Sequence, residues 1–328
     1  MAGKELSVGV LILWANFTEV QIMVKLSAFP KCYVEDICSG KISLFDWIEM
    51  ATELEPDGLE LYSGFLESYD SEYLSKVRNS IAEHGFQMPM MCYSPDFTLK
   101  DVNRWQREVE KQKEIIRVTA ELEGKFCRVL SGQKRPGISE DEGVRLVVEA
   151  IQSCLPVAEE YDVTLVMENH YKDSFWRRPE FAQKKHVFLK IVDQMDSPYF
   201  GIQFDPSNSI VAGEDPIDLL QAVKHRVKTM HASDRYLEPG TILEELKQSD
   251  GTIGYSAKLL HGITGKGLND YDKIFSILKE VNFHGWISIE DGMNGMEEMK
   301  ASLLFLKEMR KKYFEDIPFE ARTRSKRC

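Results

Sequence analysis

The 328-residue sequence lacks several features that would assign it to a common class of protein. It has no long apolar run that could span a membrane and no visible signal peptide, so we expect a soluble, cytoplasmic protein without a membrane partner. None of its six cysteines belongs to a Cys-x-x-Cys pair, and we expect all six to be reduced. Acidic residues also outnumber basic ones, 53 to 41. The net charge of -12 argues against nucleic acid as a partner, because phosphate binding depends on Lys and Arg.

What the sequence does contain is an alternation of short apolar runs and amphipathic segments, repeated about eight times. Such an alternation is typical of a parallel sheet with crossover helices, and eight repeats close a barrel. We therefore predict an α/β fold, a (β/α)8 TIM barrel that forms one domain over residues 1–315. The basic stretch 316–328 is predicted to be a solvated, frayed tail.

Local signals place most of the predicted elements. Helices are predicted at 43–54, 71–84, 103–122, 140–161, 186–195, 215–225, 270–281 and 295–313, and early strands at 58–62, 88–93 and 126–130. Two runs, 8–14 and 20–27, compete for the first strand. We favour the second, because the segment after it has the composition of an active-face loop. The stretch between His231 and Glu290 is too long for one ordinary crossover, which predicts a long loop insertion between strands 7 and 8.

Four acid or imidazole side chains stand at the ends of apolar runs in the second half of the chain: Glu168, Asp205, His231 and Glu290. In a parallel barrel, the carboxyl ends of the strands are where chemistry collects. Three carboxylates and one imidazole form a hard ligand set, which suits Mn²⁺, Mg²⁺ or Co²⁺ better than a structural zinc. Any one carboxylate could instead cap a helix, but four such residues at successive strand ends favour a site for one divalent metal ion.

The residues around these positions resemble the xylose-isomerase-like TIM-barrel superfamily, which holds sugar isomerases, ketose 3-epimerases, inosose dehydratases and endonuclease IV. The resemblance rests on Glu168-Asn-His170, Asp205-Pro-Ser-Asn208, His231-Ala-Ser-Asp-Arg235, Gly265-Lys-Gly267 and Ile289-Glu290-Asp. It covers the second half of the chain closely and the first half in topology. It implies that the four strand-end residues hold one ion, Mn²⁺ first, with Co²⁺ or Mg²⁺ as alternatives. We also expect Asn208, Asp234 and Arg235 to contact the substrate.

The resemblance also separates the members of this superfamily. Endonuclease IV needs additional histidines for a three-metal cluster, whereas this chain has Asn208, Ser94 and Ser131 at the positions concerned. Ketose 3-epimerases likewise tend to carry histidine where Asn208 stands. A DNA-repair function is therefore disfavoured, and a free ketose is a less obvious substrate.

The predicted site favours chemistry at the carbon next to a sugar carbonyl. A metal that polarises the carbonyl lowers the pKa of the neighbouring C–H, and Glu168 and Glu290 could then act as base and acid. Isomerisation, epimerisation and elimination all remain open at this point. His170 lies two residues beyond Glu168 and could serve as a second base, or it could be a hydrogen-bonded histidine at the barrel mouth without a catalytic role.

The pattern as a whole resembles the α subunit of the C-glycoside deglycosidases. It includes the segment Ala28-Phe-Pro-Lys-Cys-Tyr33, the turn Asp234-Arg235-Tyr236 and the long insertion. This resemblance implies a metal-dependent carbon–carbon lyase that takes a 3-oxo-C-glycoside, removes the C2 proton and expels the aromatic aglycone, with Glu168, His170 and Glu290 as catalytic residues. It further implies a small β subunit and a higher oligomer. The alternatives are a sugar or sugar-phosphate isomerase, a 3-epimerase, an inosose-dehydratase-like lyase, and a non-enzymatic scaffold. The intact ligand set disfavours the scaffold.

Overall fold

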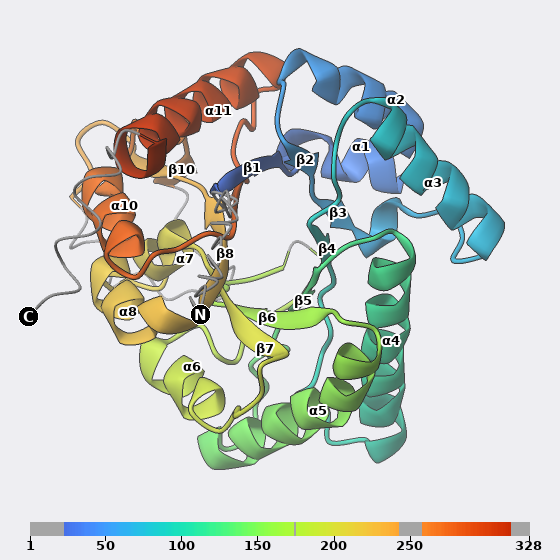
Figure 1. Ribbon diagram of the computed structural model, residues 1–328. Coiled ribbons are helices and arrows are strands. Elements are labelled where there is room, and N and C mark those ends of the chain that lie inside the picture. The colour runs from blue at the N-terminus through green and yellow to red at the C-terminus, as the bar shows by residue number, and fades with distance from the viewer. Residues whose placement is uncertain (1–22, 174, 243–257, 316–328) are drawn as a thin grey trace, which may run out of the picture.

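A computed structural model of the chain describes residues 23–173, 175–242 and 258–315. At its centre, nine parallel strand segments follow the order β2-β1-β11-β8-β7-β6-β5-β4-β3 and curl into a barrel (Figure 1). The segments are β1 (Lys25–Ala28), β2 (Gly58–Leu59), β3 (Leu61–Tyr62), β4 (Met90–Cys92), β5 (Phe126–Val129), β6 (Thr164–Glu168), β7 (Phe200–Phe204), β8 (Val227–Ala232) and β11 (Trp286–Ile289).

Two short segments, β2 and β3, share one strand position and close the ring. β2 pairs with β1, β3 pairs with β4, and Glu60 alone separates the two segments along the chain. The nine segments therefore fill eight strand positions, in agreement with the eight repeats of the sequence. The predicted fold is confirmed as a single-domain (β/α)8 TIM barrel.

Helices surround the barrel on its outer side (Figure 1). They are α1 (Val34–Cys38), α2 (Leu44–Met50), α3 (Ser71–Glu83), α4 (Val102–Glu121), α5 (Glu140–Glu160), α6 (Lys185–Val192), α7 (Pro206–Val211), α8 (Pro216–Val223), α10 (Tyr271–Glu280) and α11 (Met296–Arg310). Short 3-10 turns occur at Lys31–Tyr33, Ala51–Glu53, Ser63–Phe65 and Lys224–Arg226, and a π turn occurs at Lys311–Glu315. Within the described ranges, no helix is long and apolar enough to cross a membrane.

Sequence signals explain where helices begin and end. The Ser43 hydroxyl accepts the backbone N–H of Asp46, whose carboxylate accepts the Ser43 N–H, so a capping box starts α2. Gly85, with φ at 79°, closes the end of α3 in the left-handed conformation that glycine adopts without strain. The strands read as apolar runs because both faces are covered, and every residue of β7 is buried.

The structure also decides several details of the predicted element order. The observed β1 overlaps the second of the two candidate first strands, 20–27, whereas the first candidate, 8–14, lies outside the described residues. Between β8 and α10 the chain adds an antiparallel pair, β9 (Arg235–Leu237) and β10 (Leu259–His261). The rest of the predicted insertion, 243–257, lies outside the described residues, as does the predicted tail 316–328. The five cysteines that the structure describes are free thiols, and Cys328 lies beyond the described part of the chain.

Candidate metal centre and active site

The barrel brings the four strand-end residues of the sequence prediction together. Glu168 is the last residue of β6, Asp205 follows β7, His231 lies in β8 and Glu290 follows β11. Each offers one ligand atom, and these four atoms lie within 4.8 Å of one another. All four side chains are buried. Parallel strands deliver their carboxyl ends to the same end of the barrel, which is why residues so distant in sequence meet here.

The four residues leave a place for a cation. The Nδ1 atom of His231 is buried and forms no hydrogen bond, and it lies 3.3 Å from Glu168 Oε1 and 3.5 Å from Glu290 Oε2. Burial, with the charges of Glu290 and Glu168, raises the pKa of Asp205 to about 7. Such a shift reflects burial first and, in addition, the repulsion among clustered carboxylates. A divalent ion would relieve this repulsion and satisfy the imidazole, so the residues fit the predicted metal.

Asp205 shows that a helix cap and a candidate metal ligand need not exclude each other. Its Oδ1 atom accepts the backbone N–H of Asn208 at 3.1 Å, which caps α7, and also the Ser233 hydroxyl at 2.8 Å. Both bonds hold the carboxylate in one orientation, with Pro206 in the first turn of the helix. The cap therefore places the carboxylate at the cluster instead of diverting it.

Each of the two glutamates also has a cation of its own. Arg128 Nη1 lies 2.9 Å from Glu168 Oε2, and Lys31 Nζ lies 2.9 Å from Glu290 Oε1. Burial opposes ionisation of Glu168, but Arg128 and His231 outweigh it and lower its pKa to about 2. Lys31 and His231 likewise hold the pKa of Glu290 well below its ordinary value against the effect of burial. Both glutamates are therefore anionic and suited to bind a cation.

His170 is held by a buried carboxylate beside this cluster. Its Nδ1 atom lies 2.9 Å from Glu180 Oε2, while Glu180 Oε1 accepts the backbone N–H and the hydroxyl of Ser131 at 2.7 and 2.8 Å. The ring also meets Trp176 edge-on, with centroids 6.4 Å apart. This arrangement fixes the imidazole and leaves Nε2 as the ring nitrogen that can face a ligand.

A cavity of about 310 Å³ opens next to the cluster and has both charged and apolar walls. Its lining includes Phe29, Lys31, Tyr62, Arg128, His170, Asp173, Phe175, Glu290 and Met293. Phe175 is 58% exposed and stacks on Tyr62, with ring centroids 6.1 Å apart and planes 10° apart. The cavity thus combines ionisable side chains with an exposed aromatic surface.

The sequence matches a family model described as the xylose isomerase-like TIM barrel over residues 45–309, most of the chain. The chain belongs to this family. The predicted membership of the xylose-isomerase-like superfamily is therefore confirmed.

Curated proteins that are similar to part of this chain include a dehydratase and a decarboxylase. An inosose dehydratase from Clostridium beijerinckii is 24% identical over 153 residues, which are 46% of this chain and 47% of that protein. A 3-oxo-isoapionate decarboxylase from Pectobacterium atrosepticum is 28% identical over 160 residues, 48% of each protein. The chain thus spans about half the length of the curated relatives it matches.

Solved structures of similar barrels align over most of the chain. A D-tagatose 3-epimerase-like protein has a TM-score of 0.69 at 18% identity and covers 90% of this chain and 100% of its own. The IolI protein, described with a bound zinc atom, has a TM-score of 0.68 at 16% identity and covers 89% of this chain and 100% of its own. At these identities the likeness shows a common fold.

The three residues predicted to contact the substrate have different surroundings. The Asn208 amide donates to Glu168 Oε1 at 3.3 Å, beside the cluster, and Arg235 lies in β9 and is buried. Asp234, by contrast, accepts the backbone N–H groups of Gly265, Gly267 and Asn269 at 3.0, 2.8 and 3.1 Å. Its carboxylate therefore also holds this loop in place, and its contact with the substrate stays a prediction, as do those of Asn208 and Arg235.

Sequence reasoning missed the charged residues that surround the predicted ligands. Arg128 lies within the apolar run of β5, and Glu60 lies within the apolar run 58–62. A single charge inside such a run is the signal that could have identified both, because burial of a charge is costly without a partner. Lys31 was part of the segment singled out after β1, but nothing in the sequence indicated its pairing with Glu290.

Proposed function

We propose that this chain removes the proton next to a sugar carbonyl and expels a substituent from the following carbon. The most specific form of this proposal is the catalytic α subunit of a C-glycoside deglycosidase, which takes a 3-oxo-C-glycoside. One observation carries the proposal above the others: an imidazole held by its own buried carboxylate, His170 with Glu180, lines the same cavity as Glu290. The site therefore offers a proton-transfer group beyond the two glutamates.

We propose that Glu168, Asp205, His231 and Glu290 hold the metal, with Mn²⁺ first and Co²⁺ or Mg²⁺ as alternatives. The zinc described in the IolI structure adds a further candidate to compare. When bound, the ion would polarise the sugar carbonyl and lower the pKa of the neighbouring C–H. Arg128 and Lys31 keep the glutamates anionic and hold their carboxylates at the cluster.

The proposed reaction is an elimination across C1 and C2 of the sugar. A glutamate, Glu168 or Glu290, takes the C2 proton, because the carbonyl at C3 makes that proton acidic. The bond between C1 and the aglycone carbon breaks and a C1–C2 double bond forms. The electron pair of the broken bond stays on the aglycone carbon, which takes up a proton. No oxidant or reductant is needed, because the C3 carbonyl is already present in the substrate.

His170 is proposed to act on the aglycone. Loss of a phenolic proton increases the electron density of the aromatic ring and assists protonation of the departing carbon. The Glu180 carboxylate at Nδ1 stabilises an imidazolium that forms when Nε2 accepts that proton. Burial opposes the charged form of His170, but the carboxylates of Glu168 and Glu180 outweigh it and raise its pKa. The exposed ring of Phe175 on Tyr62 supplies an apolar surface for an aromatic aglycone.

A second candidate is a lyase or isomerase that acts on a simpler sugar or sugar phosphate. Its support is the similarity to an inosose dehydratase and a 3-oxo-isoapionate decarboxylase over about half of the chain. Dehydration begins with the same proton abstraction and expels hydroxide instead of carbon, whereas an epimerase or isomerase returns the proton to the sugar. The same pair of glutamates could serve each of these reactions.

We also propose a partner for the face that follows β8. The C-glycoside resemblance implies a small β subunit, and the insertion 236–264 is the proposed contact. Within its described part, Tyr236 and Ile242 are 42% and 60% exposed, although both are large apolar residues. A higher oligomer belongs to the same proposal.

The experiment that tests the proposal compares 3-oxo-C-glycosides with free ketoses and inososes as substrates of the metal-loaded protein. Release of the free aglycone from the C-glycoside supports the lyase. Rapid interconversion of a ketose and its epimer, without aglycone release, supports the epimerase. A protein that binds no metal and converts none of these compounds would instead be the scaffold that the ligand set disfavours.

A further inference from the structure

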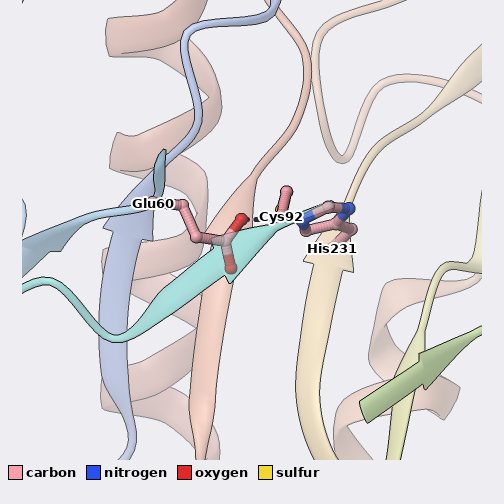
Figure 2. Close-up of side chains that lie close together, drawn as sticks. All are labelled: Glu60, Cys92 and His231. Atoms are coloured by element: carbon pink, nitrogen blue, oxygen red, sulfur yellow. Dashed lines mark hydrogen bonds and ion pairs between the residues drawn. The ribbon is translucent and has the colours of Figure 1, made fainter. Parts of the chain in front are cut away.

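A buried carboxylate contacts the one imidazole of the candidate metal centre from the side opposite the cluster. Glu60 Oε2 lies 2.7 Å from Nε2 of His231. Figure 2 shows Glu60 at the seam between β2 and β3, with its side chain directed across the barrel to the ring on β8, and with Cys92 of β4 beside them. Because Glu60 accepts the Nε2–H, Nδ1 is the ring nitrogen that faces the carboxylates of Glu168 and Glu290, and it is the nitrogen that would bind a cation in place of its own proton.

Packing alone does not account for Glu60. Its side chain is 1% exposed, and a buried carboxylate costs free energy that an apolar residue of similar volume would not cost. The strand that carries it is otherwise apolar, with Leu59 and Leu61 fully buried on either side. The chain also breaks its strand pairing at this residue, between β2 and β3. The hydrogen bond with His231 offsets part of the cost of burying this carboxylate.

We infer that Glu60 is a positioning residue for the metal centre, which selects the Nδ1-ligating tautomer of His231 and fixes the plane of its ring. This inference rests on the proposed metal site but not on the lyase reaction. Carboxylates that accept the second N–H of a ligating histidine orient the ring and increase its basicity, and their loss typically costs about 10- to 100-fold in metal affinity or activity.

A second metal site at Glu60, Cys92 and His231 is the competing interpretation. Their potential ligand atoms also lie within 4.8 Å of one another, and all three side chains are buried. The separation of 2.7 Å between Glu60 and His231 is, however, that of a direct hydrogen bond. Metal stoichiometry distinguishes the two interpretations.

The test measures Mn²⁺ affinity and stoichiometry by titration calorimetry on the metal-stripped full chain and on two variants. Glu60→Met removes the acceptor at similar volume, and we expect its Kd to weaken about 10- to 100-fold with one ion per chain. Glu60→Gln keeps an acceptor but loses the charge, so we expect an intermediate Kd. The absorption spectrum of the Co²⁺-loaded protein should change in Glu60→Met, because the orientation of a ligand has changed.

Two matched controls separate this effect from general damage. Glu180→Gln alters the buried carboxylate of the other histidine, and Cys92→Ala removes the third member of the cluster. Both should keep the wild-type Kd for Mn²⁺. Circular dichroism and thermal unfolding verify that each variant is folded. If Glu60→Met does not fold, the test rests on Glu60→Gln: a Kd for Mn²⁺ weakened several-fold supports the inference, and an unchanged Kd overturns it.

The outcomes are distinct. A folded Glu60→Met protein with the wild-type Kd overturns the inference, and so does a wild-type protein that binds two ions of which the variant loses one, because Glu60 would then itself be a ligand. Wild-type protein that binds no Mn²⁺, Co²⁺, Mg²⁺ or Zn²⁺ overturns the proposed metal site on which the inference rests. Loss of affinity in Glu60→Met without any C-glycoside cleavage by the wild type leaves the inference standing and contradicts only the proposed reaction.

Discussion

Individual charges at the mouth of the barrel are arranged in pairs that place each candidate ligand. Arg128 holds Glu168, Lys31 holds Glu290, and Glu60 holds His231, while Asp205 is fixed by the helix that it caps. A cluster of buried carboxylates would otherwise repel itself and take up protons. These pairs explain why Glu168 and Glu290 stay anionic, whereas the pKa of Asp205, which pairs with no Lys or Arg in the described part of the chain, is raised to about 7 by burial and by the charges of Glu290 and Glu168.

The first prediction concerns metal binding by Asp205. Asp205→Asn keeps the cap of α7, because an amide oxygen also accepts at this position, but removes one negative charge from the cluster. We expect the variant to fold, to lose the divalent ion and to lose turnover. Metal analysis after purification, with His231→Ala alongside, measures this. Full activity in a metal-depleted Asp205→Asn protein would contradict it.

The second prediction concerns proton transfer by the glutamates. Glu168→Gln and Glu290→Gln each retain one oxygen ligand and remove a base, so turnover should fall by roughly 10²- to 10⁴-fold, well beyond any loss of substrate affinity. Steady-state kinetics and metal analysis of the same samples separate the two effects. Substrate deuterated at C2 should react more slowly or exchange with solvent. If chemistry limits the rate and the deuterated substrate shows neither slower reaction nor exchange, the reaction would instead be a hydride transfer or a hydrolysis.

The third prediction separates elimination from isomerisation at His170. His170→Ala should abolish cleavage of a 3-oxo-C-glycoside while metal binding and deuterium exchange at C2 persist, because the earlier step belongs to a glutamate. Glu180→Gln should weaken cleavage in the same selective manner, since Glu180 orients the ring. Product analysis and mass spectrometry of recovered substrate give both readouts. A protein that epimerises a free ketose and is only modestly slowed by His170→Ala would contradict the lyase.

The residues that sequence reasoning identified are those at the ends of strands. A polar residue that follows an apolar run is visible in one dimension, and the barrel topology brings four such residues together. Lys31, Arg128 and Glu60 were not identified, because their partners are 259, 40 and 171 positions away and no local pattern encodes such contacts.

At the scale of secondary structure, helix signals were reliable where caps are local. The boundaries of α3, α4 and α5 fall within two residues of those predicted, because glycine, serine and aspartate act on the turn next to them. The short helix α7 was not predicted, since six residues that begin with proline after a strand read equally well as a loop. The break between β2 and β3 has no sequence signal apart from a single charge.

The fourth prediction concerns the loop between β10 and α10. Asp234 accepts three backbone N–H groups of this loop, and a Cβ on Gly267 would lie 2.3 Å from Asp234 Oδ1. Asp234→Ala should lower the free energy of unfolding by about 1–3 kcal/mol, because it leaves buried donors without an acceptor. Chemical denaturation measures the loss. As a control, Asp272→Ala removes an exposed ion pair with Lys312 and should change stability by less than about 1 kcal/mol. Equal effects in the two variants would show that Asp234 does not hold the loop.

At the scale of the whole molecule, the sequence was sufficient to predict a closed barrel with its candidate site at the carboxyl ends of the strands. Eight apolar repeats and four acid or imidazole residues at strand ends were sufficient for that, because barrel topology allows few alternatives. The reaction could not be predicted from the sequence, since the same set of side chains could serve several reactions that begin with removal of a proton next to a sugar carbonyl.

The fifth prediction concerns the assembly. If the face around Tyr236 and Ile242 binds a small β subunit, the isolated chain should cleave C-glycosides weakly until that subunit is added. The test is to identify a small protein that co-purifies with the chain, to recombine the two, and to measure the activity and the size of the complex. Tyr236→Ser together with Ile242→Ser should prevent assembly while metal content is retained. Full activity of the isolated chain would show that no partner is required.

One reaction tests the central proposal most directly. Metal-loaded protein, reconstituted with the proposed β subunit, is incubated in D₂O with a 3-oxo-C-glycoside and a free ketose together, and all products are identified by mass spectrometry. We predict that the C-glycoside gives free aglycone and an unsaturated keto sugar, while the ketose stays unreacted. Metal-stripped protein and Asp205→Asn should form neither aglycone nor unsaturated sugar. Conversion of the ketose to its epimer, with the C-glycoside left intact and without deuterium at C2, would contradict the proposed lyase.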